Sequence, residues 1–158
     1  MAKRVLIVEP DPETARDLFL LFHFEREDYQ LEIVESVAEA LEKVQTVNFH
    51  CIIIDVNLPE MNSYEAIPLM KTINNPTLPI IVTTDRNTLE LETKVREQDV
   101  YYYHLKSFNQ NELKLAVRSV FEKSGKAKRN RKPDKGPAKP ILLKQLRLYR
   151  KERGTRYG

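Results

Sequence analysis

Acidic, hydroxyl and basic side chains follow the apolar runs of the sequence. Glu9 and Asp11 come after the first run, and Asp55 directly follows the third. Thr84 and Lys106 come after the fourth and the fifth. Carboxylates held close together repel one another unless a cation lies among them, and hard oxygen ligands favour Mg²⁺. A lysine and a hydroxyl beside them suit a phosphoryl group, so Asp55 is a candidate nucleophile that would form an aspartyl phosphate.

The apolar runs alternate with segments of helical periodicity, which predicts five strands and five helices. The strands are expected at residues 5–8, 31–34, 51–54, 79–82 and 100–103, and the helices at 13–26, 36–44, 62–73, 88–98 and 109–121. Such alternation is typical of an α/β fold with a parallel sheet, and right-handed crossovers make it doubly wound. The functional groove of such a sheet lies at the carboxyl ends of its strands, where the polar residues would meet.

Local signals support several of these elements. Residues 51–54 are all apolar, which indicates a strand buried on both faces, with Cys51 as a small buried hydrophobic residue. Ser36 and Glu39 have the spacing of a capping box at a helix start. Asn62 is expected to cap the third helix, and Pro68 should bend or shorten it.

Composition divides the chain into two parts of opposite charge. From residue 123 onward there are fourteen Lys and Arg and two acids, a net charge of about +12. The twelve basic and twenty-one acidic residues before it leave about −9. We therefore expect a domain over residues 1–122, a basic mobile linker over 123–140, and a short basic amphipathic segment over 141–158.

The basic tail allows several interpretations. It could serve solubility alone, or it could attract nucleic acid through counterion release. Its stripe of Leu142, Leu146 and Tyr149 could lie on an anionic membrane surface, or the tail could dock on the acidic body. No apolar run is long enough to span a bilayer and nothing resembles a signal peptide, so we expect a cytoplasmic protein.

Four motifs occur in order on the expected elements: residues 5–9 (VLIVE), 52–59 (IIIDVNLP), 79–84 (PIIVTT) and 105–108 (LKSF). With them, the first 122 residues or so resemble the receiver domains of two-component response regulators. The resemblance implies a flavodoxin-like fold with strand order 2-1-3-4-5. It also implies that Asp55 is the phosphoacceptor and Glu9 the first acid of the pair that holds Mg²⁺. Asn57 matches the position whose backbone carbonyl binds the metal.

The resemblance also implies roles for three further residues. Thr84 matches the hydroxyl that moves to the phosphoryl oxygen, and Lys106 matches the cation that pairs with the phosphoryl group. Tyr103 matches the aromatic switch that turns inward when the hydroxyl is recruited. Ordinary strand packing is the alternative for Tyr103, and a β-branched residue at a strand end is the alternative for Thr84.

Four positions depart from the family pattern, and one of them is Ser63, which stands where a glycine is common. Pro10 stands where the second acid is expected, and it offers no metal ligand. Asp11 could replace that acid, or it could serve only as negative charge at a helix start. Asp85 could crowd the phosphoryl pocket, and Ser107 stands where the family usually has proline.

The resemblance implies a signalling switch rather than an enzyme. A histidine kinase or phosphotransfer protein would phosphorylate Asp55, and a downstream protein would read the altered face. The departures at Pro10, Asp85 and Ser107 leave a second interpretation open: a pseudo-receiver that binds proteins without phosphorylation.

Overall fold

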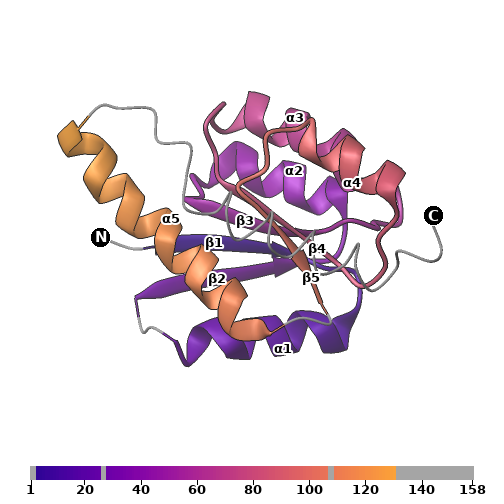
Figure 1. Cartoon of the computed structure of the whole chain (residues 1–158), viewed down its shortest axis with the longest axis horizontal. Coiled ribbons are helices and arrows are strands. Elements are labelled where there is room, and N and C mark those ends of the chain that lie inside the picture. Colours follow the sequence, from indigo (N-terminus) through magenta and orange to yellow (C-terminus); the bar gives the residue numbers. More distant parts are fainter. Residues whose placement is uncertain (1–2, 26–27, 107–108, 131–158) are drawn as a thin grey trace.

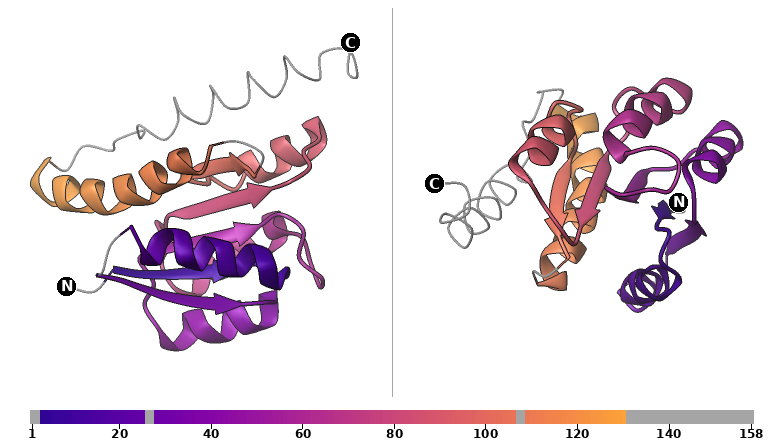
Figure 2. Two further views of the ribbon diagram at one scale, coloured as in Figure 1. Left: turned by 90° about the horizontal axis from the view of Figure 1, so that it is seen from below. Right: turned by 90° about the vertical axis from the view of Figure 1, so that its right-hand side faces the viewer.

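The computed structural model describes residues 3–25, 28–106 and 109–130. Its core is a parallel sheet in the order β2-β1-β3-β4-β5, which confirms the predicted doubly wound fold. The strands are β1 (Lys3–Val8), β2 (Tyr29–Val34), β3 (Cys51–Asp55), β4 (Ile80–Thr84) and β5 (Tyr102–Leu105). In Figure 2 (left) the strands lie side by side, with the indigo and violet pair at the opposite edge from β5.

Helices cover both faces of the sheet (Figure 1). They are α1 (Pro12–His23), α2 (Val37–Thr46), α3 (Ser63–Ile73), α4 (Leu89–Arg96) and α5 (Gln110–Asn130). Helices α1 and α5 lie on one face, and α2, α3 and α4 lie on the other. Within the described ranges, no helix is long and apolar enough to cross a membrane.

The central strands form the core. Every residue of β3 and β4 is buried, and Val5 to Val8 of β1 have no exposed surface. Each aliphatic side chain fully buried here contributes about 1.5–3 kcal/mol of hydrophobic stabilisation. Cys51 is buried as predicted, and burial raises the pKa of its thiol to about 12, so the thiol stays protonated.

One of the two helix starts with a predicted cap forms the expected side-chain hydrogen bond, and the other does not. The Ser36 hydroxyl accepts a hydrogen bond from the Glu39 N–H at 3.2 Å. Asn62 precedes α3 but makes no side-chain cap, because its amide donates to the Tyr64 hydroxyl at 2.8 Å. Asn62 therefore occupies the predicted cap position of α3, but its side chain forms no capping hydrogen bond.

Several predicted boundaries are corrected: β1 and β2 each begin two residues earlier than predicted, and α1 ends at His23 rather than at residue 26. Strand β5 begins at Tyr102, two residues later than predicted, because Asp99 adopts a left-handed φ of 53° and delays entry into the sheet. Helix α5 runs to Asn130, so residues 123–130 are helical rather than part of the linker. Lys, Arg and Ala in this stretch favour helix. The remaining linker and segment 141–158 lie outside the described residues, and their partners stay predictions.

Candidate functional site

The carboxyl ends of four strands meet at one edge of the sheet. Glu9 follows β1, and its N–H donates to the Val34 carbonyl at 3.0 Å. Lys106 follows β5, and its N–H donates to the Thr84 carbonyl at 2.7 Å. Asp55 is the last residue of β3. These backbone bonds continue the sheet past its strands, so the side chains of Glu9, Asp55 and Lys106 converge.

Lys106 joins two carboxylates. Its Nζ lies 2.7 Å from Glu9 Oε1 and 3.3 Å from Asp55 Oδ2. Glu9 is 1% exposed and Asp55 is 8% exposed, so both carboxylates are shielded from bulk solvent. The Asn57 N–H donates to Asp55 Oδ1 at 3.3 Å, which orients the second oxygen of this carboxylate. The sequence predicted that these side chains lie together although Glu9 and Lys106 are 97 residues apart in the chain, and the structure confirms this proximity.

The electrostatics of the cluster shift the pKa of Glu9 toward neutral pH. Burial is the largest cause and the Asp55 charge adds to it, while the hydrogen bond from Lys106 opposes both, and together they raise the pKa of Glu9 to about 7. Burial alone would lower the pKa of Lys106, but the hydrogen bond to Glu9 and the charges of both acids raise it overall. Lys106 therefore stays charged, whereas Glu9 changes its charge near pH 7.

Asp11 serves as the cap of helix α1. Its Oδ2 accepts from the Thr14 N–H at 3.0 Å and from the Thr14 hydroxyl at 2.6 Å. These hydrogen bonds lower the pKa of the Asp11 carboxyl. Its backbone N–H donates to Glu9 Oε2 at 3.3 Å. Of the two roles left open by the sequence, the structure supports the helix cap.

The side chains do not assemble a metal centre on three acids. Among the described residues, no group of three or more His, Cys, Asp or Glu side chains could hold a metal ion. Pro10 offers no ligand, and the Asp11 carboxylate is bonded to Thr14. Glu9 and Asp55 remain, with the Lys106 ammonium between them. Of the predicted Mg²⁺ ligands, Asp11 is therefore engaged as a helix cap, whereas Glu9, Asp55 and the Asn57 carbonyl remain the predicted ligands, because Mg²⁺ is commonly held by one or two carboxylates together with waters.

The hydroxyl of Thr84 is bonded within its own loop. It donates to the Arg86 carbonyl at 2.5 Å and accepts from the Arg86 N–H at 3.2 Å. Thr84 is fully buried, whereas the neighbouring Asp85 is exposed. A phosphoryl group on Asp55 would have to draw the Thr84 hydroxyl away from the Arg86 carbonyl.

Tyr103 is buried beneath α4 and hydrogen-bonded there. Its hydroxyl donates to Asn87 Oδ1 at 2.5 Å, and Asn87 Nδ2 donates to Glu92 Oε1 at 2.5 Å. All three side chains are at most 1% exposed. The network ties the β4–α4 loop to α4 and to β5, and it holds the predicted aromatic switch in the inward position.

Asn87 and Glu92 belong to this hydrogen-bond network but were not predicted from the sequence. One signal was present, because Glu92 stands three residues before Val95 on the inward face of α4. Charge at such a position is costly unless it is hydrogen-bonded, so it implies a buried polar partner. The partner itself could not be found by spacing, since Asn87 and Tyr103 lie in other elements.

Known proteins resemble this chain in sequence. Residues 5–118 match the family model of the response regulator receiver domain. The transcriptional regulatory protein SrrA of Staphylococcus aureus is 25% identical over 124 residues, which cover 78% of this chain and 50% of that protein. The chain therefore spans about half the length of the curated relatives it matches.

Solved structures show the same fold. A CheY-like receiver domain from Methanospirillum hungatei superposes with a TM-score of 0.73 at 24% identity, covering 80% of this chain and 98% of that one. The receiver domain of a sensor histidine kinase from Pseudomonas aeruginosa has a TM-score of 0.67 at 20% identity, covering 77% and 99%. That structure holds a magnesium ion in its active-site cleft.

Proposed function

The chain belongs to the response regulator receiver domain family of two-component signalling, and from this premise we propose that Asp55 accepts a phosphoryl group and thereby switches the protein. The observation that carries the proposal is the contact of Lys106 Nζ with both Glu9 and Asp55 at the strand ends. Phosphorylation of Asp55 would change the state of the chain itself and hydrolysis would restore it, so the chain acts as a switch rather than an enzyme.

The proposed transfer uses the polar groups that lie together at the carboxyl ends of the strands. Asp55 Oδ2 attacks the phosphorus of a donor, an O–P bond forms, and the leaving group departs with the electron pair of its own bond to phosphorus. Lys106, 3.3 Å from that oxygen, stabilises the negative charge on the phosphoryl oxygens. Asn57 orients the carboxylate through its N–H. Lys106 supplies positive charge in this step, and Glu9 and Asp55, with the Asn57 carbonyl, would hold a Mg²⁺ ion that would supply more.

A histidine kinase or phosphotransfer protein is the proposed donor, and a downstream protein is the proposed reader. The reader would contact the face of α4, β5 and α5, because Tyr103 connects the strand ends to α4 through Asn87. Leu89 on α4 and Leu115 on α5 are 51% and 49% exposed, which gives this face apolar contact surface.

The test is phosphorylation of the intact chain by acetyl phosphate, with and without Mg²⁺. We expect mass spectrometry to find one added phosphoryl group, absent from Asp55→Ala. Asp85→Ala is the matched control, because Asp85 is an exposed acid near the same sheet edge and should leave the adduct intact. No adduct with either preparation, or an adduct that survives Asp55→Ala, contradicts the proposal.

A second candidate function is a binding module that does not depend on phosphorylation. The observation that favours it is the state of the switch residues: Tyr103 is already inward and bonded to Asn87, while the Thr84 hydroxyl is bonded to Arg86. Backbone NMR spectra distinguish the two functions. The switch requires shifts in α4 and β5 after acetyl phosphate treatment, whereas the module gives unchanged spectra.

A further inference from the structure

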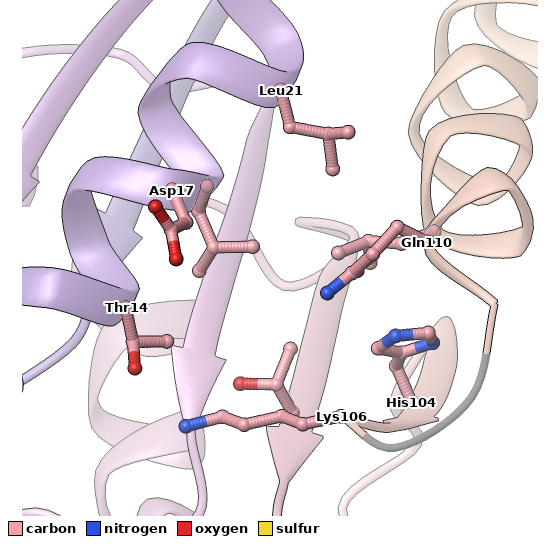
Figure 3. A pocket seen from close by; sticks show the side chains of 9 residues that line it. Thr14, Asp17, Leu21, His104, Lys106 and Gln110 are labelled. Atoms are coloured by element: carbon pink, nitrogen blue, oxygen red, sulfur yellow. The ribbon is translucent and has the colours of Figure 1, made fainter.

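A cavity of about 420 Å³ lies between α1 and α5, over the carboxyl ends of β4 and β5 (Figure 3). Leu18, Leu21 and Leu113 supply its apolar wall. Lys106 lines it as well, so the cavity shares this residue with the Asp55 cluster, while the two acids of that cluster are not among its lining residues. Cavities of about 300–1,000 Å³ are the size that small-molecule ligands occupy.

Two buried polar residues line this cavity from the sheet. Thr83 on β4 pairs with His104 on β5, and each is 1% exposed. Among the described groups, the Thr83 hydroxyl has no hydrogen-bond partner. Buried hydroxyls are nearly always paired, so an orphaned one that faces a cavity points to a ligand or an ordered water.

The imidazole ring of His104 adds a second polar group to the cavity, and this ring is uncharged. Burial lowers the pKa of its imidazole to about 4, so the ring is neutral at physiological pH. A neutral imidazole has one donor nitrogen and one acceptor nitrogen. Gln110, at the start of α5, hydrogen-bonds this ring, and Figure 3 shows its amide directed toward the cavity.

The charges around the cavity disfavour charged occupants. A cationic ligand would meet the Lys106 ammonium in the wall. An anionic ligand would meet Asp17 at the rim, and it would compete with the two carboxylates that already accept from Lys106. A neutral molecule avoids both penalties and can still use the Thr83 and His104 groups.

We propose that this cavity binds a small uncharged molecule with an apolar body and one hydrogen-bonding edge. Its apolar body packs against Leu18, Leu21 and Leu113, and its polar edge hydrogen-bonds the Thr83 hydroxyl beside the His104 ring. The site is distinct from the phosphoacceptor, and its occupancy does not require Asp55 to be phosphorylated.

Three molecules of the same shape and different charge test the proposal: nicotinamide, nicotinate and 3-(aminomethyl)pyridine. Each is titrated into the full chain at pH 7.5 while backbone amide signals of Thr83, His104 and Leu113 are followed by NMR. We expect saturable shifts with nicotinamide and at least tenfold weaker binding of the two charged molecules.

Three variants test whether nicotinamide binds in this cavity. Thr83→Val keeps the shape of the side chain and should weaken nicotinamide binding about tenfold, the effect of one lost hydrogen bond. Gln110→Ala removes an exposed side chain that hydrogen-bonds the His104 ring, and it should weaken nicotinamide binding several-fold. Thr93→Val, exposed on α4 across the sheet, is the control and should bind normally.

Three outcomes overturn the proposal. If no probe gives saturable shifts at these residues, the cavity holds water. If nicotinate or 3-(aminomethyl)pyridine binds as well as nicotinamide, the neutral class is wrong. If Thr83→Val and Gln110→Ala both bind nicotinamide like the unaltered chain, the site lies elsewhere. Each result is independent of the acetyl phosphate experiment.

Discussion

Replacing Glu9 by Gln should remove a large part of the pH dependence of stability. Glu9 is 1% exposed, and burial raises its pKa from 4.5 to about 7. Each pKa unit corresponds to about 1.36 kcal/mol, so ionising Glu9 in the folded protein costs about 3 kcal/mol relative to the unfolded chain. The Gln side chain cannot ionise, and its amide oxygen can still accept from Lys106.

The sign of the effect follows from proton binding. Between pH 4.5 and 7 the folded state holds a proton on Glu9 that the unfolded chain has lost. The free energy of unfolding therefore falls as pH rises through this window, and the loss is complete above about pH 7. In Glu9→Gln this contribution is absent, so the variant should gain about 3 kcal/mol relative to the parent between pH 4 and pH 8.

Urea unfolding from pH 4 to pH 8, followed by circular dichroism, measures this difference. Glu42→Gln, on the exposed face of α2, is the matched control and should track the parent at every pH. Comparing differences between variants removes the pH dependence of the groups that do not interact with Glu9. If the stability curves of Glu9→Gln and the parent stay parallel across the window, the Glu9 carboxyl does not titrate as the geometry requires.

Three other changes test separate features of the structure. Pro10→Asp adds a third carboxylate at the sheet edge, so Mg²⁺ titration by calorimetry should show tighter binding than in the parent; equal affinity would mean that the missing acid is not what limits the metal. Asn87→Ala removes the buried hydrogen bonds to Tyr103 and Glu92, and it should lower the free energy of unfolding in urea by about 1–3 kcal/mol, with shifted Tyr103 ring signals. Unchanged stability and ring signals would show that this network does not hold the ring. Ser36→Ala removes the α2 cap and should cost about 1 kcal/mol in the same unfolding assay, and no loss would refute its capping role.

Much of the fold could be predicted because its signals are local. The apolar positions at residues 51–54 and the capping pattern at Ser36 report burial and helix starts within a few residues. Errors arose where a backbone conformation or a particular side-chain pair, rather than periodicity, decided the outcome. Strand β5 was placed two residues early because the left-handed turn at Asp99 has no periodic signal. The side chain of Asn62 was assigned to a cap, but Tyr64 binds it instead.

Some features of the candidate site could likewise be predicted from the sequence, whereas others could not. The sequence alone determined that Glu9, Asp55 and Lys106 converge, because parallel strands in a doubly wound sheet place their carboxyl ends at one edge. Only the tertiary structure decided the hydrogen-bond partners. It assigned Asp11 to the cap of α1. It also placed Tyr103 against Asn87. Periodicity specifies which face a side chain occupies, whereas a hydrogen bond depends on distances of a few ångströms between residues that are far apart in the chain.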